Sequence, residues 1–175
     1  IMRRRQRQMC IRDRSKIEDF TNGSSFHRVL WDDAEKGSSS TELAKDKNIR
    51  RVVMCSGKVY FDLLEERDAR GLNDIYLLRF EQFYPFPAMS ALKELERFQN
   101  AEMVWCQEEP KNQGAWSFME PNIEWVLSRM KAKFKRPIYV GRPASASPAT
   151  GLASQHKEQQ KLLVEEALNL KENKK

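Results

Sequence analysis

Residues 51–63 read Arg-Val-Val-Met-Cys-Ser-Gly-Lys-Val-Tyr-Phe-Asp-Leu, and this stretch decides the fold class. The apolar run at residues 51–55 has the length and the β-branched content of a buried strand. Gly57 permits a tight turn, and Val59 and Leu63 after it fall on one side of a helix. The stretch therefore predicts a strand, a turn and a helix, which is the repeating unit of an α/β protein.

The same order of strand and helix recurs further along the chain. Residues 75–80 and 102–106 are short apolar runs, and apolar residues at helical spacing follow each of them. A fifth, short strand is expected at residues 138–140, ahead of a final helix. Because proline has no N–H, we expect the strand at residues 102–106 to end before Pro110, and we expect Pro121 to kink or restart the helix after it.

One more strand is predicted upstream of these units. Residues 26–31 alternate between apolar and polar side chains except at Leu30, and they predict an edge strand. The polar stretch at residues 33–50 then forms an exposed loop. Strands that alternate with helices of about 10 to 15 residues indicate a parallel sheet with right-handed crossovers. We therefore predict an α/β fold, a three-layer α/β/α domain with a five-stranded sheet.

Residues 1–14 form a basic leader. Five of the six formal net positive charges fall within the first fifteen residues, so the rest of the chain is nearly neutral. The leader has neither the apolar core of a secretory signal nor a periodic apolar face. We expect it to be disordered and to come from a truncated or mis-joined reading frame, so that the domain spans residues 15–175. A mitochondrial transit peptide, or an arm that binds nucleic acid or anionic lipid, remains an alternative.

Cysteines, glycines and hydropathy exclude several kinds of site. The three cysteines, Cys10, Cys55 and Cys106, form no spaced pair, which favours a reduced compartment over a disulfide framework or a zinc site. None of the seven glycines forms Gly-x-Gly, as dinucleotide fingerprints and the Gly-Asp-Gly signature of thiamine enzymes require. Val52 stands where a Walker phosphate loop needs glycine. No apolar run approaches the about 20 residues of a membrane span, so we expect no membrane partner.

Residues 105–116, Trp-Cys-Gln-Glu-Glu-Pro-Lys-Asn-Gln-Gly-Ala-Trp, form a polar corner between a strand and a helix. Such corners often carry binding groups in α/β folds. Glu108 and Glu109 could form an acid and base pair, but neighbouring residues of an extended strand point to opposite faces, and no histidine is close in sequence. We therefore predict no catalytic, cofactor-binding or metal-binding residue, and a turn or domain-interface role for the corner. The residues of this role are Gln107, Glu108, Glu109, Asn112, Gln113 and Gly114.

A second candidate site lies at the start of the helix after residues 51–55. Backbone N–H groups at Ser56-Gly57-Lys58 could hold an anion beside the Lys58 ammonium, although a plain turn that needs glycine is the alternative. Arg79 ends the neighbouring strand and could add a second cation to the same rim, or it could be a solvated or paired charge. We expect the lone histidines, His27 and His156, to be structural or exposed.

Four long motifs stand in a fixed order along the chain. They are residues 51–63, Leu-Arg-Phe-Glu-Gln-Phe-Tyr-Pro-Phe-Pro at 78–87, the corner at 105–116, and Gly-Arg-Pro-Ala-Ser-Ala-Ser-Pro-Ala-Thr-Gly at 141–151. In this order they resemble the carboxyl-terminal domain of the decarboxylating first component of the 2-oxoglutarate dehydrogenase complex. The resemblance runs from about Ser15 to Leu170, and several positions resemble bacterial members, so we expect a bacterial fragment.

The resemblance implies a transketolase-like carboxyl-terminal domain, in which the first strand of a five-stranded mixed sheet runs antiparallel to the others. The complete enzyme acts in the tricarboxylic acid cycle, where it decarboxylates 2-oxoglutarate and passes the succinyl group to the lipoyl-bearing succinyltransferase component. Its thiamine diphosphate and magnesium belong to the preceding domains. The implied partners are therefore those domains, a second subunit in a homodimer and the lipoyl-bearing component, and the fragment alone would be inactive and bind no cofactor.

Some members of the family also have a regulatory site for acyl-CoA or a nucleotide, which we place at Arg28, Ser56, Lys58 and Arg79. The implied location is the bacterial cytoplasm, or the mitochondrial matrix if the source is eukaryotic. The alternative is a free-standing ligand-binding or adaptor module of the same fold, whose basic arm would bind nucleic acid. We do not expect nucleic acid as a partner, because the positive charge is confined to the leader.

Overall fold

The computed structural model describes residues 21, 25–35, 37 and 39–168, so the basic leader at residues 1–14 lies outside the described residues. The strands of this part of the chain are β1 (Val29–Leu30), β2 (Arg51–Cys55), β3 (Ile75–Phe80), β4 (Glu102–Pro110) and β5 (Ile138–Arg142). They form one sheet in the order β1-β3-β2-β4-β5. β1 pairs antiparallel with β3, and the other pairs are parallel, which confirms the predicted five-stranded mixed sheet.

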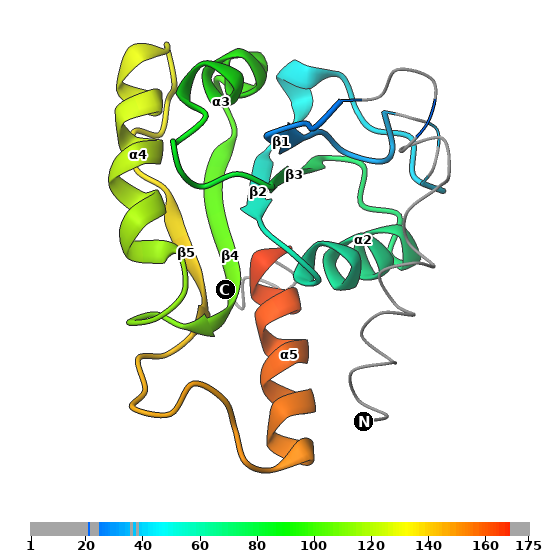
Figure 1. Ribbon diagram of the computed structural model, residues 1–175. Helices are drawn as coiled ribbons and strands as arrows, with labels where there is room; N and C mark the ends of the chain where they lie inside the picture. The colour runs from blue at the N-terminus through cyan, green and yellow to red at the C-terminus, as the bar shows by residue number, and fades with distance from the viewer. Residues whose placement is uncertain (1–20, 22–24, 36, 38, 169–175) are drawn as a thin grey trace.

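Helices cover both faces of this sheet (Figure 1). The helices are α2 (Val59–Ala69), α3 (Ala88–Leu95), α4 (Trp116–Arg129) and α5 (Ala153–Ala167), with two short 3-10 turns, η2 (Asp46–Asn48) and η3 (Glu96–Phe98). α3 and α4 pack on one face, and α2 and α5 pack on the other. The domain therefore has the predicted three layers.

Each face of the sheet buries its own apolar core. All five residues of β2 are buried, as expected for a central parallel strand covered on both sides. Because side chains alternate along a strand, Met54 and Trp105 face α3 and α4, whereas Val53, Cys55 and Cys106 face α2 and α5. The short apolar runs of the sequence are therefore strands with two buried faces.

The prediction that β4 ends before Pro110 was wrong. Beyond Trp105, β4 pairs only with β5, and an irregularity follows Cys106 before the pairing resumes with Pro110 opposite Arg142. The next N–H along the chain, that of Lys111, donates to the Arg142 carbonyl at 3.0 Å. Since proline is tolerated where pairing is one-sided and irregular, its missing N–H breaks no regular ladder here.

Two other predictions, a helix that restarts at Pro121 and an edge strand over residues 26–31, also differ from the structure. α4 continues through Pro121 as one helix, so the chain does not restart there. Pro121 is exposed, and water can bond the carbonyl that its ring leaves without a partner. The edge strand expected at residues 26–31 is present only as Val29–Leu30.

The parallel strands β2, β3 and β4 all end at one side of the sheet, which we call the carboxyl edge. Because β1 runs in the opposite direction, the chain enters the sheet at this edge, where the Arg28 carbonyl accepts hydrogen bonds from the N–H groups of Glu81 (3.0 Å) and Gln82 (3.2 Å). At the opposite edge, Arg51 Nη1 donates to the carbonyls of Glu166 (3.1 Å) and Ala167 (3.0 Å). The described chain thus enters at one edge and α5 ends at the other.

Candidate functional site at the carboxyl edge

The buried amide of Gln107 organises the corner between β4 and α4. Its Oε1 accepts hydrogen bonds from Trp105 Nε1–H at 3.0 Å and from the Trp116 backbone N–H at 2.9 Å. Its Nε2 donates to three carbonyls of the turn, those of Glu109 (3.2 Å), Pro110 (3.2 Å) and Gln113 (2.8 Å). One side chain therefore joins the end of the strand, the turn and the first residue of the helix.

Gly114 is the residue that lets the turn close on Gln107. Its φ of +66° lies in the left-handed region, which side chains rarely adopt. A Cβ at this position would lie 2.9 Å from Gln107 Nε2 and 3.0 Å from Glu109 Cβ. The position therefore favours glycine for two reasons, the backbone conformation and the close approach of the amide.

The next corner residues fasten a second loop. Asn112 Nδ2 donates to the Ser145 carbonyl at 3.0 Å, and Asn112 Oδ1 accepts the Ser145 N–H at 2.9 Å. Gln113 Nε2 donates to the same carbonyl at 3.1 Å. The corner thereby holds the segment that connects β5 to α5, which the sequence placed in a separate motif.

The two glutamates of the corner have different surroundings. Glu108 Oε1 lies 3.9 Å from Lys58 Nζ at the start of α2. The Glu109 side chain is exposed, and its backbone carbonyl accepts a hydrogen bond from the Tyr139 hydroxyl at 3.2 Å. Glu108 is therefore partly neutralised by a cation, while Glu109 is held by its backbone rather than by its carboxylate.

The structure places Arg28 and Arg79 on the same face of the sheet. The β1–β3 register sets Leu30 opposite Arg79, and its continuation sets Arg28 opposite Glu81. Arg79 already has partners, because its guanidinium lies 4.7 Å from the centre of the Tyr60 ring and its Nε lies 2.8 Å from Glu81 Oε1. Most of the Arg79 charge is thus engaged inside the domain.

Ser56 and Lys58 flank the turn that opens α2. Gly57 between them has a φ of +73°, and α2 has no side-chain N-cap. Within its first turn, the N–H groups of Tyr60 and Phe61 donate to the carbonyls of Gly57 (3.4 Å) and Lys58 (3.0 Å). Lys58 Nζ lies 3.1 Å from Asp62 Oδ2, yet the Lys58 side chain is 61% exposed. Of the four proposed anion-site residues, Lys58 is therefore an accessible cation, whereas Arg79 is stacked and paired.

Sequence reasoning missed a cation at the end of β5. The Arg142 side chain is buried, and its Nη2 lies 3.0 Å from His156 Nδ1 and 3.4 Å from Gln160 Oε1. Gln160 Nε2 in turn donates to Asp62 Oδ2 at 2.9 Å. These contacts fasten α5 to the sheet and to α2. His156 is exposed and in contact with Arg142, which agrees with the expectation that it is structural or exposed.

A buried ion pair was also missed. Asp32, just after β1, pairs with Arg67 of α2, and both side chains are fully buried. Asp32 Oδ2 also accepts the Leu77 N–H at 2.7 Å. Burial raises the pKa of Asp32, and the charge of Arg67 opposes this effect. The available signal was the spacing of Arg67, which falls on the buried side of α2 with Val59 and Leu63.

An open hollow lies beside the corner at the carboxyl edge, with a volume of about 450 Å³. Aromatic side chains form much of its wall, and we call it the aromatic hollow: its residues include Phe83, Tyr84, Trp105 and Phe118, with Ser56 and Gly57 at its polar side. Tyr84 is 85% exposed and Phe118 is 37% exposed. The hollow therefore presents apolar surface to the outside of the domain.

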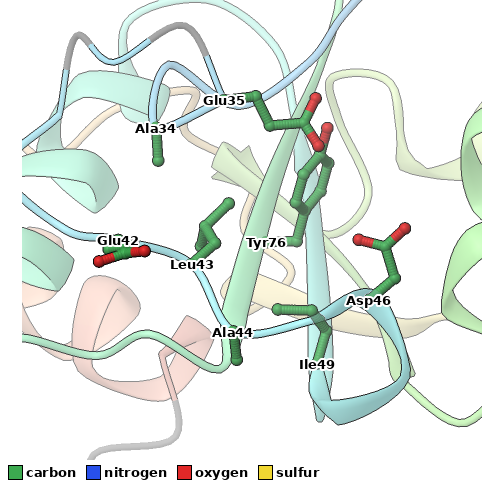
Figure 2. Close-up of a pocket in the computed structure, with 8 residues that line it drawn as sticks. All are labelled: Ala34, Glu35, Glu42, Leu43, Ala44, Asp46, Ile49 and Tyr76. Carbon is green, nitrogen blue, oxygen red and sulfur yellow. The ribbon is translucent and has the colours of Figure 1, made fainter.

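A second, smaller cavity of about 230 Å³ lies near β3 (Figure 2). It is lined by Ala34, Glu35, Glu42, Leu43, Ala44, Asp46, Ile49 and Tyr76. Two of its carboxylates are neutralised by one cation, because Arg97 pairs with Glu35 and, at 3.0 Å, with Asp46. Two of the three acidic side chains of the wall, those of Glu35 and Asp46, are therefore engaged in ion pairs within the domain.

Neither described cysteine has the properties of a nucleophile. Burial raises the pKa of Cys55 to about 12 and raises that of Cys106 well above its usual value. Among the described residues, no group of three His, Cys, Asp or Glu side chains could hold a metal ion. In the same part of the chain, no helix is both long and apolar enough to cross a membrane.

Fold and site together define a class: a three-layer α/β domain with an antiparallel first strand and a braced, polar corner at the carboxyl edge. The family model described as 2-oxoglutarate dehydrogenase C-terminal matches residues 14–168. The chain belongs to this family, which confirms the resemblance read from its four motifs.

Curated relatives agree with this assignment. The 2-oxoglutarate dehydrogenase E1 components of Brucella anthropi and Brucella ovis are each 59% identical to the chain over 155 residues, which is 88% of this chain. The same stretch is only 16% of the first relative and 15% of the second. The chain therefore spans about a sixth of the length of the relatives that it matches.

Proposed function

We propose that this chain is the carboxyl-terminal domain of a 2-oxoglutarate dehydrogenase first component. In this role it supports the oxidative decarboxylation of 2-oxoglutarate to the succinyl-dihydrolipoyl enzyme in the tricarboxylic acid cycle of a bacterial cytoplasm. The observation that carries the proposal is the family match over residues 14–168, nearly the whole described domain. The partners in this proposal are the preceding domains of the same polypeptide, a second copy of the subunit and the lipoyl-bearing succinyltransferase component.

We assign the chemistry of decarboxylation to the preceding domains. Thiamine diphosphate, with magnesium, stabilises the carbanion that decarboxylation leaves on the substrate. The residues of this chain do not fit that cofactor, because the sequence has no Gly-Asp-Gly and the described part has no metal-binding group. No step of the reaction is therefore given to a residue of this chain.

The contribution of the domain is structural in this proposal. The Gln107 amide and the left-handed Gly114 fix the backbone of the corner, and Asn112 fastens the following loop to it. A fixed corner can present Glu108, Glu109 and Gln113 to a neighbouring domain without paying entropy to order them on contact. This supports the interface role that we give to the corner.

We further propose that an anionic effector, an acyl-CoA or a nucleotide, binds at Arg28, Ser56, Lys58 and Arg79. The uncapped start of α2 and the exposed Lys58 ammonium support this assignment, because helix N-termini and cations together attract phosphate. Calorimetry with acetyl-CoA and with AMP tests it on Lys58→Ala. Lys161→Ala is the matched control, since Lys161 is also exposed and also pairs at i,i+4 within its helix.

Binding heat that disappears in Lys58→Ala and persists in Lys161→Ala is the expected result for the effector site. Equal heats for the unmodified chain and Lys58→Ala would refute it. Such a result would leave the structural role untouched, because Lys58 has no contact with Gln107 or Gly114 among the interactions described above.

Deletion of residues 15–175 from the complete polypeptide tests the structural role. We expect the shortened polypeptide to lose 2-oxoglutarate decarboxylation and dimerisation, and this chain alone to release no CO₂ when thiamine diphosphate and magnesium are added. Full activity of the shortened polypeptide would overturn the role, and activity of the chain alone would overturn the assignment of the chemistry. The DNA sequence upstream of the chain distinguishes this proposal from the alternative of a free-standing module. The proposal predicts a continuous reading frame that encodes Gly-Asp-Gly, whereas a free-standing module predicts its own start codon.

A further inference from the structure

Two buried thiols lie side by side in the sheet, although they are far apart in the sequence. β2 and β4 are neighbouring parallel strands (Figure 1), and the last pair of their ladder is Met54 opposite Trp105. The next residue of each strand is a cysteine, so the same register sets Cys55 opposite Cys106. Met54 and Trp105 belong to one apolar core, whereas both cysteines belong to the other. The two thiols therefore point to the same face of the sheet.

The spacing of the strands brings the two cysteines within reach of a disulfide. Paired strands lie about 4.8 Å apart, and the Cα atoms of disulfide-bonded cysteines are about 4.4–6.8 Å apart. The Cβ atoms must approach slightly more closely than in a regular ladder. The backbone has room for this shift, because the β2–β4 ladder ends at the preceding pair and an irregularity follows Cys106 in the pairing of β4 with β5. Burial raises the pKa of Cys106 and Cys55 raises it further, as expected for neighbouring thiols.

We propose that Cys55 and Cys106, both free thiols in this structure, are an oxidisable pair that a hydroperoxide converts into a disulfide between β2 and β4. One sulfur takes an oxygen atom from the hydroperoxide and becomes a sulfenic acid, and the hydroperoxide leaves as an alcohol, or as water if it is hydrogen peroxide. The second sulfur then attacks the first, the S–O bond breaks, and the oxygen leaves as water with the proton of the second thiol. Because Ser56 and Gln107 follow the two cysteines, the disulfide would act beside both candidate sites of the carboxyl edge.

The surroundings of the two thiols set the order of the steps. Arg79 lies opposite Cys55 in the β2–β3 register, and its charge opposes the rise that burial gives to the pKa of Cys55. At Cys106, by contrast, Cys55 and Glu108 add to the effect of burial on the pKa. Since the thiolate is the reactive form of cysteine, Cys55 is the sulfur that takes the oxygen, and Cys106 is the sulfur that displaces it as water.

Burial sets the pace of this oxidation. Both thiols are fully buried in the core beneath α2 and α5, so they react only when a covering helix opens locally. Because they lie on the same face, one opening exposes both while β2 and β4 stay paired. The pair therefore responds to sustained oxidation and does not turn over as a catalytic site.

Oxidation of the full chain by hydrogen peroxide tests the proposal. Cys10→Ser removes the third cysteine, so that only the pair remains. The matched control carries Cys55→Ala and Val53→Cys in the same background, which moves one thiol two positions along β2. Val53 is as buried as Cys55 and belongs to the same core, but it lies opposite Val104. The control thiol therefore stands diagonally to Cys106 at about 8 Å, too far for a disulfide.

Mass spectrometry after denaturation in N-ethylmaleimide measures the product. A disulfide lowers the mass by two hydrogens and prevents labelling, and dithiothreitol restores the labelling. We expect the disulfide to form at least about tenfold faster in the Cys10→Ser protein than in the control, because the register holds the second thiol at a high effective concentration. Tryptic peptides joined through positions 55 and 106 would locate the bond.

Equal rates in the two proteins would overturn the proposal, because a disulfide that forms only in the unfolded chain does not depend on the register. Sulfinic acid in place of the disulfide, or a doubled mass from a bond between two chains, would overturn it as well. If the control loses its circular dichroism spectrum, Cys106→Ala with Val104→Cys makes the same comparison from β4. The pair lies within this chain, so these outcomes do not depend on the proposed function.

Discussion

The backbone N–H of Trp116 donates a 2.9 Å hydrogen bond to Oε1 of Gln107, nine residues earlier in the chain. α4 has no side-chain cap at Ala115, so this bond satisfies one of the N–H groups that the start of a helix leaves open. The cap comes from the end of β4 rather than from the helix itself. The direction in which α4 leaves the sheet therefore depends on one buried amide.

Replacement of Gln107 by leucine should destabilise the domain strongly. Gln107→Leu leaves the Trp116 N–H and the Trp105 indole N–H buried without acceptors, and we expect the free energy of unfolding to fall by about 2–4 kcal/mol. Urea denaturation measures the change. Gln99→Leu is the control at an exposed glutamine and should change stability by less than about 0.5 kcal/mol. Equal effects of the two substitutions would contradict the role of the amide.

Alanine substitutions at Gly37 and Gly114 distinguish the cost of backbone strain from the cost of steric crowding by a new Cβ. Gly37 and Gly114 have the same φ of +66°, but a Cβ at Gly37 would meet nothing within 4 Å, whereas a Cβ at Gly114 would meet Gln107. Both alanine variants should lose about 1–3 kcal/mol from the left-handed conformation, and Gly114→Ala should lose more than Gly37→Ala. Thermal unfolding compares them. If Gly114→Ala were as stable as Gly37→Ala, the Gln107 amide would be able to move away from the new Cβ without cost, which would contradict this prediction.

The buried pair of Asp32 and Arg67 should contribute far more than an exposed pair. Arg67→Met leaves the Asp32 carboxylate buried without its cation, and we expect a loss of about 3–5 kcal/mol. Arg136→Met breaks the pair with Glu124 at a side chain that is 82% exposed, and it should cost less than about 1 kcal/mol. Chemical denaturation of both variants, with Asp32→Asn added for a double-mutant cycle, measures the difference. A loss below 1 kcal/mol for Arg67→Met would contradict this account.

The thiol of Cys55 gives a prediction about pH. Its pKa rises on folding from about 9 to about 12, so the folded protein retains a proton that the unfolded chain loses between these values. Stability should therefore fall as the pH rises from about 9 towards about 12, and Cys55→Ala should make the fall less steep.

In a Cys10→Ser background, a thiol reagent at neutral pH should react only as fast as the domain opens. Labelling at the rate of a free cysteine without denaturant would show that the thiol is accessible.

The strands and helices between residues 51 and 142 could be predicted because the spacing of apolar residues, and the glycines and prolines between elements, are local features of the sequence. The antiparallel direction of β1 came from the family resemblance, since two residues of edge strand carry too little pattern to reveal it. The expectation for Pro110 failed for a different reason. Whether a proline ends a strand depends on the neighbour with which that strand pairs, and β4 pairs beyond Trp105 only with β5.

The corner residues stand out in the sequence, but their contacts do not. Gln107 and Gly114 are seven positions apart, and only the folded turn brings the amide against the glycine. The pairs formed by Asp32 with Arg67 and by Arg142 with His156 join separate elements of the fold. The spacing of Arg67 indicates only that its side chain is on the buried side of α2, and no local pattern identifies the partner. Likewise, the stacking of Arg79 on Tyr60 depends on how α2 crosses β3, so the sequence left open whether Arg79 is a cation of the rim or a paired charge.

The most direct test of the central claim is an exchange of domains. Residues 15–168 of this chain would replace the matching segment of the Brucella anthropi relative, and CO₂ release from 2-oxoglutarate would be measured with thiamine diphosphate and magnesium. We predict that the chimera works within about tenfold of the unmodified relative, a difference of about 1.4 kcal/mol in activation free energy, while the relative without the segment is inactive. A chimera that folds and assembles like the relative but releases no CO₂ would contradict the claim that this chain is the carboxyl-terminal domain of such an enzyme.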